Sequence, residues 1–212
     1  MKAPLRAAAK KLKKIVITGG PSGGKTTLIE TLQKEFPREV AVVTEAASVL
    51  YRGGFPRIAS SRARVHAQRA IYFVQSELEN LAQGQARKGT FLICDRGSVD
   101  GAAYWPGGMS SFFRSLGTSL NDELSRYDWV LHLDTTRSAS YGTNNPVRTE
   151  NHEQAIKLNQ KIKKAWARHP RRLVLPHQEQ FSQKTQLAIE IVRLIFSDAS
   201  YDLVADFLNS KL

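Results

Sequence analysis

The 212-residue chain has one cysteine and no long apolar run. Cys94 can form no disulfide within the chain, which favours a reducing compartment. No stretch approaches the roughly 20 apolar residues of a membrane-spanning helix, and no signal-peptide core is found. The five histidines show no metal-ligand spacing, and no Ser-His-Asp arrangement is found. We therefore expect a cytoplasmic protein without a structural zinc site.

Acidic residues are scarce, since 19 Asp and Glu face 31 Lys and Arg, a formal net charge of +12. Six of the basic residues lie in the first fourteen positions, and a second cluster spans residues 157–172. We expect residues 1–12 to form a basic N-terminal tail that precedes one domain, residues 13–212. The clusters could bind an anionic partner such as nucleic acid or lipid, but the pattern favours a solvated tail and a solvated helix face. No zinc-finger or RNA-binding motif accompanies the charge.

Short apolar, β-branched runs alternate with longer helical patterns along the chain. This alternation predicts an α/β fold in which helices cover both faces of a five-stranded parallel sheet. Ligands of such sheets bind beyond the carboxyl ends of the strands. The strands are predicted at 14–19, 40–44, 90–95, 128–134 and 172–176, and the helices at 25–35, 62–86, 110–126, 151–169 and 183–196, with a short one after them.

A glycine cluster follows the first predicted strand in the sequence IVITGGPSGGKTT. Gly19, Gly24, Lys25 and Thr26 match G-x-x-x-x-G-K-[ST], the phosphate-binding loop, in its required place between a strand and a helix. Backbone N–H groups of such a loop converge on phosphate, lysine binds the β- and γ-phosphates, and the threonine hydroxyl binds Mg²⁺. The alternative is a glycine-rich turn without a ligand. The residues predicted to bind ATP or GTP are Gly19, Gly20, Pro21, Ser22, Gly23, Gly24, Lys25, Thr26 and Thr27.

Charged residues end the second and third predicted strands. Asp95 ends an apolar run, as a Mg²⁺-binding carboxylate does, and Arg96 follows at the edge where substrate is expected. The alternative is a solvated turn with a surface ion pair. Glu45 follows the second strand, where it could accept the proton of an attacking hydroxyl, or it could cap the helix that begins next.

Further pocket residues are predicted on the helix 62–86 and after Asp95. Gln68, Tyr72 and Gln75 form a polar stripe that suits a polar ring or a sugar, although the pattern alone favours a solvated face. Tyr104 and Trp105 suit either a pocket wall or core packing.

The polar stretch at about residues 135–150 has no regular pattern, and loops of this length often serve as active-site lids. Arg137 and Arg148 lie within it. An arginine on a closing lid can neutralise charge on a transferred phosphoryl group, whereas a surface loop with solvated arginines is the alternative.

Four motifs, GGPSGGKTT, TEAA, CDRG and NNPVRTE, together resemble the P-loop AAA-type ATP-binding domain family related to the nicotinamide-riboside kinase domain of NadR. The resemblance covers about residues 13–196, and it extends more distantly to deoxynucleoside and thymidylate kinases. It implies a kinase-like P-loop NTPase fold. It assigns Lys25 and Thr26 to the nucleotide and metal, Glu45 to the acceptor, Asp95 and Arg96 to metal and acceptor, and Arg148 to the lid. Gly97 stands where nucleoside kinases commonly carry serine or an aromatic residue, so the acceptor is less defined than the nucleotide.

We therefore expect a Mg²⁺-dependent small-molecule kinase that transfers the γ-phosphoryl group of ATP or GTP to a nucleoside-like hydroxyl. The alternative is a nucleotide-dependent switch or ATPase that binds a macromolecular or anionic-membrane partner. A Ras-like switch is disfavoured because the guanine-specifying N-K-x-D sequence is absent, and because Ser98, rather than glycine, is the third residue after Asp95.

Overall fold

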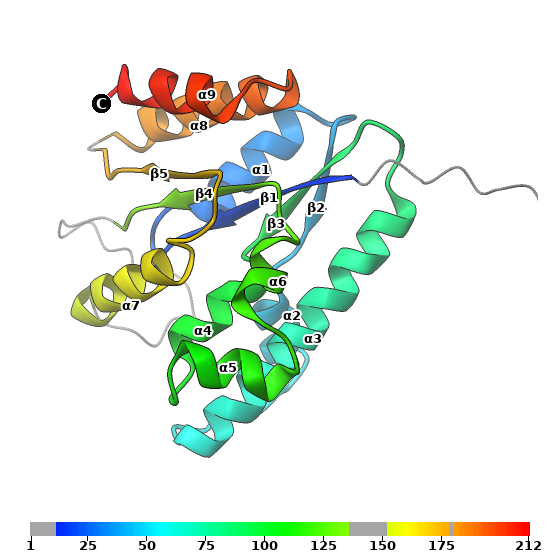
Figure 1. Ribbon diagram of the computed structural model, residues 1–212, viewed down its shortest axis with the longest axis vertical. Helices are drawn as coiled ribbons and strands as arrows, with labels where there is room; N and C mark the ends of the chain where they lie inside the picture. The colour runs from blue at the N-terminus through cyan, green and yellow to red at the C-terminus, as the bar shows by residue number, and fades with distance from the viewer. Residues whose placement is uncertain (1–11, 136–151, 179) are drawn as a thin grey trace, which may run out of the picture.

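The computed structural model describes residues 12–135, 152–178 and 180–212, and within them one sheet of five parallel strands (Figure 1). The strand order is β2-β3-β1-β4-β5, so β1 lies at the centre of the sheet. The predicted parallel α/β fold is confirmed, and each predicted strand lies within one or two residues of an observed one. The strands are β1 (Lys13–Thr18), β2 (Val40–Val43), β3 (Phe91–Asp95), β4 (Trp129–Leu133) and β5 (Arg172–Leu175).

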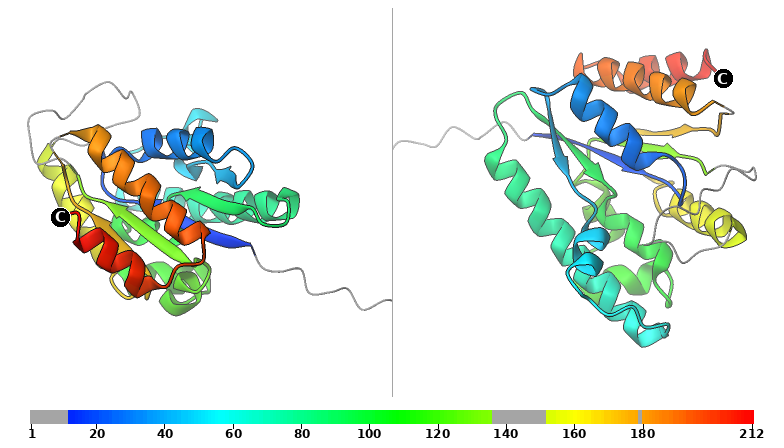
Figure 2. Two further views of the ribbon diagram at one scale, coloured as in Figure 1. Left: turned by 90° about the horizontal axis from the view of Figure 1, so that it is seen from above. Right: turned by 180° about the vertical axis from the view of Figure 1, so that it is seen from behind.

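Helices cover both faces of this sheet, which gives three layers (Figures 1 and 2). On one face, α1, α8 and α9 pack against the strands, and on the other face lie α3 to α7. The helices of the described residues are α1 (Lys25–Glu35), α2 (Ala46–Arg52), α3 (Ser61–Gln85), α4 (Gly101–Tyr104), α5 (Met109–Leu116), α6 (Leu120–Leu124), α7 (His152–Ala165), α8 (Phe181–Phe196) and α9 (Tyr201–Asn209), with a 3-10 turn, η1 (Ser98–Asp100).

Side chains of the central strand point alternately to the two faces of the sheet, which explains why helices cover both faces. Ile15 and Ile17 join the core beneath α1, α8 and α9, while Val16, between them, joins the core beneath α4, α5 and α7. Successive side chains of a strand point to opposite faces, so a strand with only apolar residues must be buried on both sides. The apolar run in β1 therefore determines a buried central strand.

The predicted helix 110–126 is wrong, because the chain forms two short helices there, α5 and α6. Gly117 ends α5 in a left-handed conformation, with φ of +71°, and Ser119 caps α6 by accepting a hydrogen bond from the N–H of Asp122. A glycine with positive φ followed by a serine cap is a common way to end one helix and begin the next.

No helix in the described parts of the chain combines the length and apolar character needed to cross a membrane. The predicted tail lies almost entirely outside the described residues, which begin at Leu12.

Candidate functional site

The glycine-rich loop lies directly against the end of β4. A Cβ atom on Gly19, whose φ is +131°, would lie 2.1 Å from the carbonyl oxygen of Leu133, and one on Gly23 would lie 2.9 Å from it. Both positions therefore need glycine, because a side chain would overlap the backbone of the neighbouring strand. Gly24 precedes the first turn of α1, whose N–H groups face the loop. We call residues 19–26 the phosphate loop.

Lys25 is buried at the start of α1 and folds back onto the loop. Its Nζ donates a hydrogen bond to the carbonyl oxygen of Gly20 at 2.7 Å. Burial, together with the nearby charge of Arg96, lowers the pKa of Lys25 to about 7. A bound polyphosphate would favour the charged form and draw this ammonium group away from the carbonyl.

Oxygen donors for a metal ion lie beside Lys25. Thr26 and Thr27 are exposed at the first turn of α1, and Asp95 ends β3. Burial raises the pKa of the Asp95 carboxyl to about 6. The described residues hold no cluster of three or more His, Cys, Asp or Glu suited to a metal. A hydroxyl and a carboxylate nevertheless fit Mg²⁺, which completes its shell with phosphate oxygens and water.

Glu45 occupies the N-cap position of α2, but its side chain makes no capping hydrogen bond. Its carboxylate instead accepts hydrogen bonds from the Ser48 hydroxyl and, at 2.9 Å, from Nε of Arg96. Burial disfavours the carboxylate, yet the Arg96 charge and these hydrogen bonds outweigh it and hold the pKa of Glu45 below its usual value. Glu45 is therefore ionised at neutral pH.

Arg96 joins Glu45 to the phosphate loop. Its Nη1 donates to the carbonyl oxygen of Gly19 at 2.9 Å while its Nε donates to Glu45. The backbone of Arg96 is left-handed, with φ of +73°, and Gln75 of α3 donates to its carbonyl oxygen at 3.2 Å. The Arg96 side chain is only 16% exposed, so its ion pair with Glu45 is not the solvent-exposed surface pair that was the alternative prediction for this turn.

The structure adds Asp100 to these residues. Its carboxylate accepts hydrogen bonds from Thr18 at the end of β1, from the N–H of Gly97 at 2.9 Å and from Nε1 of Trp166 at 3.2 Å. It also lies 3.7 Å from Nη1 of Arg96. Asp100 therefore anchors the turn after β3. We call Glu45, Asp95, Arg96 and Asp100 the acceptor side, after the role that is expected from the sequence for the first three.

The solvated interpretation of the polar stripe on α3 is wrong. Gln68 and Gln75 are 7% and 3% exposed, and Tyr72 donates a hydrogen bond to Glu123 at 2.7 Å. The Oε1 atom of Gln68 lies against Gly101, where a Cβ atom would be 3.2 Å away, so the amide lies between α3 and α4.

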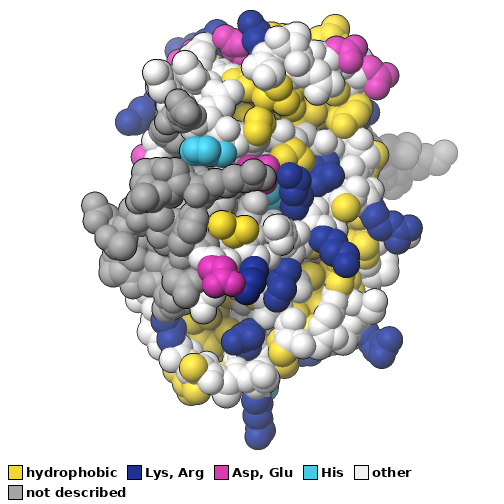
Figure 3. All heavy atoms as spheres, turned by 90° about the vertical axis from the view of Figure 1, so that its left-hand side faces the viewer, with side chains coloured by type: hydrophobic (Ala, Val, Ile, Leu, Met, Phe, Trp, Pro, Cys, Tyr) yellow, Lys and Arg dark blue, Asp and Glu magenta, His cyan; other side chains and the backbone are white. Residues whose placement is uncertain are grey.

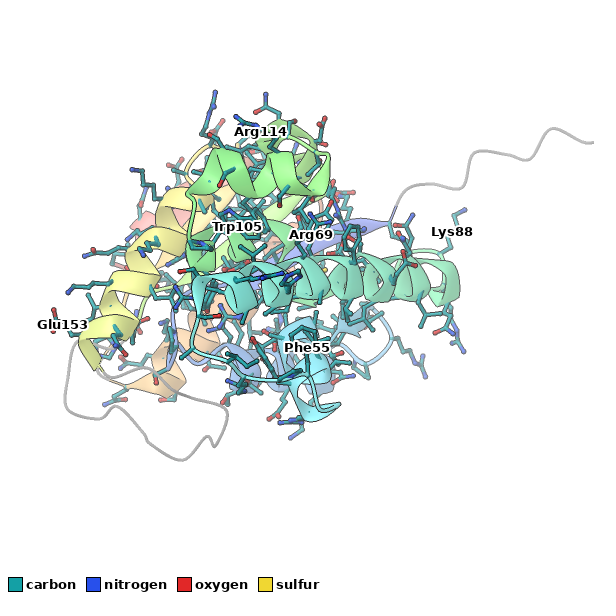
Figure 4. All side chains as sticks on the ribbon, turned by 90° about the horizontal axis from the view of Figure 1, so that it is seen from below. Phe55, Arg69, Lys88, Trp105, Arg114 and Glu153 are labelled. Carbon is teal, nitrogen blue, oxygen red and sulfur yellow. The ribbon has the colours of Figure 1, made fainter. Side chains whose placement is uncertain are left out.

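Trp105 packs in the region between α3 and α5 (Figure 4). Its ring lies edge-on to Phe112 with centroids 5.3 Å apart, and its Nε1 donates to Ser111 at 2.8 Å. Arg69 reaches from α3 to the carbonyl oxygen of Ser115 on α5 (Figure 4). Tyr104 is likewise half-buried against this core. Core packing accounts for the contacts of Trp105. Tyr104 also interacts with Arg96, since burial lowers the pKa of that guanidinium group and Tyr104 is among the groups that raise it.

The predicted lid and its arginines, Arg137 and Arg148, lie outside the described residues, as does nearly all of the basic tail. Of the second basic cluster, Lys163 binds Asp134 at 3.1 Å, while Lys161 and Lys164 are exposed. Figure 3 faces the edge where the strands end, and Lys and Arg side chains gather over its middle and lower parts.

Sequence reasoning missed four residues around the phosphate loop. Asp100 lies in a turn, and Asp134, Asn159 and Lys184 contact the loop or its neighbours from β4, α7 and α8. Asp134 carries the signal that identified Asp95, a carboxylate directly after an apolar strand, whereas the other three carry no local pattern.

Comparison with known proteins agrees with this geometry. A family model described as an AAA domain matches residues 14–184, most of the chain. The chain belongs to this AAA-domain family. A search of curated proteins finds no match. Membership makes the chain a P-loop NTPase of the nucleotide-binding kind, which usually works with Mg²⁺.

Proposed function

We propose that this AAA-domain protein is a Mg²⁺-dependent small-molecule kinase that transfers the γ-phosphoryl group of ATP or GTP to a hydroxyl. One observation carries the proposal: Arg96 holds the Glu45 carboxylate beside the phosphate loop, by hydrogen bonds to Glu45 and to Gly19. An ionised carboxylate at this position can accept the proton of an attacking hydroxyl, and it would serve an acceptor or a water molecule alike. The response to added acceptors therefore separates transfer from hydrolysis.

Each residue has a defined part in the proposed reaction. The phosphate loop and Lys25 bind the β- and γ-phosphates, and Thr26 and Asp95 would hold Mg²⁺, which offsets phosphate charge. The acceptor hydroxyl gives its proton to Glu45 as its oxygen bonds to the γ-phosphorus. The bond to the leaving diphosphate oxygen then breaks, and Arg96 offsets charge on the transferred group.

The proposed acceptor is nucleoside-like. This part of the proposal is supported by the resemblance of the four motifs to the family related to the nicotinamide-riboside kinase domain of NadR. Arg148 would complete the site as the lid arginine. Gln68, which is buried on α3, is a further candidate to bind a polar group of the acceptor.

The test measures Mg²⁺-dependent release of ADP and GDP with and without a panel of nucleosides, nucleotides and related hydroxyl compounds. A large stimulation by one compound, with its phosphorylated product detected by mass spectrometry, would support transfer and identify the acceptor. Slow hydrolysis that no compound stimulates, despite tight nucleotide binding, would contradict the proposal.

A second candidate function, a nucleotide-dependent switch with an anionic partner, is favoured by the surface that α2 and α3 provide. Residues 46–76 contain no Asp or Glu, and Arg52, Arg62 and Arg64 are exposed. These elements lie at the lower end of the face where positive charge gathers (Figures 1 and 3). Stimulation of hydrolysis by phosphatidylserine vesicles or by RNA, with no response to small acceptors, would support the switch instead.

A further inference from the structure

We propose that Asn159 and Lys184 are positioning residues that hold the phosphate loop in its binding shape before a nucleotide arrives. This inference depends on nucleotide binding, which family membership supports, and not on kinase activity or on the acceptor. Both residues lie far from the loop in sequence, on α7 and α8, and neither carries a recognised motif.

Asn159 is fixed by hydrogen bonds from three directions. Its Oδ1 accepts from the N–H of Gly20 at 2.8 Å and from Nε2 of His132 at 3.0 Å, while its Nδ2 donates to Asp134 at 2.9 Å. These partners determine which end of the amide faces the loop, because only the oxygen can accept from a backbone N–H. The side chain is 8% exposed, so water competes little for these bonds.

Lys184 binds the phosphate loop at Gly23. Its Nζ donates to the carbonyl oxygen of Gly23 at 3.3 Å and to that of Asp134 at 2.7 Å, and the residue is 4% exposed. The carboxylate of Asp134 is in turn bound by Asn159 and by Lys163. Asp134, at the end of β4, therefore connects both positioning residues to one another and to the sheet.

Gly20 is held at both of its polar atoms, which makes Asn159 important when a nucleotide binds. The carbonyl oxygen accepts from Lys25 and the N–H donates to Asn159. When the Lys25 ammonium turns to phosphate, the carbonyl loses this donor and Asn159 remains. A Cβ atom on Gly20 would lie 2.7 Å from Cβ of Asn159 and 2.4 Å from Oγ1 of Thr135, so the loop is packed closely at this point.

The fold itself does not depend on these contacts. α7 is anchored by Ile162 and by Trp166, which directly follows it, both fully buried, and α8 is anchored by Ile191 and Val192. Loss of the Asn159 amide therefore leaves the helices packed but allows the loop other conformations. The measured affinity for nucleotide then falls in proportion to the fraction of molecules whose loop is in the binding conformation.

The test compares Asn159→Leu and Lys184→Met with a matched control, Gln160→Leu, at an exposed position of α7. The probes are ADP, GDP and inorganic tripolyphosphate, with AMP and GMP as ligands that lack a β-phosphate. We expect both variants to bind the β-phosphate-bearing probes about tenfold more weakly, since a buried donor or acceptor loses its partner. Binding of AMP and GMP and the properties of the Gln160→Leu control should change little. The thermal midpoint of the two free variants should fall by only about 2–10 °C, since an unpaired buried group costs about 1–3 kcal/mol.

Two further measurements separate positioning from a general structural role. Exchange of the Gly20 amide hydrogen, followed by NMR, should accelerate in Asn159→Leu, while exchange in the core strands stays slow. Lys184→Arg should restore part of the affinity that Lys184→Met loses. Unchanged affinity for ADP, GDP and tripolyphosphate in both variants would overturn the proposal. So would equal losses for all probes accompanied by a large fall in the thermal midpoint.

Discussion

The phosphate loop and the acceptor side lie next to each other but are held by different interactions. The loop is fixed mainly by backbone contacts: Gly19 and Gly23 approach the carbonyl of Leu133, and Asn159 and Lys184 bind backbone groups of Gly20 and Gly23. The acceptor side is fixed by charged side chains, with Arg96 between two carboxylates, those of Glu45 and Asp100. A phosphate-binding loop needs one fixed conformation, whereas the proposed proton and phosphoryl transfer needs charged side chains.

Arg96 is the one residue that belongs to both arrangements among the described contacts, because it donates to Glu45 and to the Gly19 carbonyl. We therefore expect substitutions in the phosphate loop to leave the acceptor side intact, and the reverse, whereas substitutions of Arg96 should affect both.

The largest effect is expected for Glu45→Gln, which keeps the size of the side chain and an oxygen for Arg96 but removes the base. Transfer to the acceptor should fall about 100- to 10,000-fold, the range typical of general-base catalysis. Single-turnover kinetics measure transfer, and titration calorimetry should give an unchanged nucleotide affinity. Glu30→Gln, at an exposed position of α1, is the control. Transfer at the wild-type rate would refute the assigned role of Glu45.

Gly19→Ala tests the backbone contacts of the loop. The added Cβ atom would lie 2.1 Å from the Leu133 carbonyl oxygen, at a φ of +131° that alanine rarely adopts. We expect the free energy of unfolding to fall by about 3 kcal/mol, measured by urea denaturation. Gly84→Ala is the matched control, since no atom lies within 4 Å of its Cβ position in α3. It should be neutral or stabilise by up to about 1 kcal/mol. Equal effects of the two changes would show that the loop tolerates displacement.

Arg96→Lys should weaken both sides, because one ammonium group cannot bind Glu45 and Gly19 in the geometry of a guanidinium group. We expect transfer to fall about 30-fold, equivalent to ~2 kcal/mol, with a smaller loss of nucleotide affinity. Kinetic and calorimetric measurements on one preparation compare the two losses. Arg87→Lys, at an exposed position, is the control. A loss of transfer alone would mean that the bond to Gly19 contributes nothing to nucleotide binding.

The smallest effect is a pH dependence that both sides share. Asp95, with a pKa raised to about 6, must be ionised to hold Mg²⁺, so kcat/KM should fall up to tenfold per pH unit below 6. Lys25, with a pKa lowered to about 7, must be protonated to bind phosphate, so kcat/KM should also fall above 7. Glu45 stays ionised throughout because its pKa lies below its usual value. Steady-state kinetics between pH 5 and 9 test this, and a flat profile would contradict both assignments.

Much of the fold was predictable, because the signals that specify it are local. The five strands lie within one or two residues of their predicted positions, since apolar β-branched runs between turn residues are recognisable in sequence. The phosphate loop was recognisable for the same reason. The prediction of one helix at 110–126 was wrong because Gly117 ends α5 there. The polar stripe with Gln68 and Gln75 was predicted to be solvated, but it is buried, because burial depends on which elements cover a helix.

The sequence by itself determined the strand, glycine loop and helix that form the phosphate site, because backbone conformation follows from neighbouring residues. Only the tertiary structure decided which side chains hold that loop. Asn159 and Gly20 are 139 positions apart, and Arg96 and Glu45 are 51 positions apart. Their pairing depends on how β3, β4, α2 and α7 pack around the sheet, and no local pattern of residues encodes it.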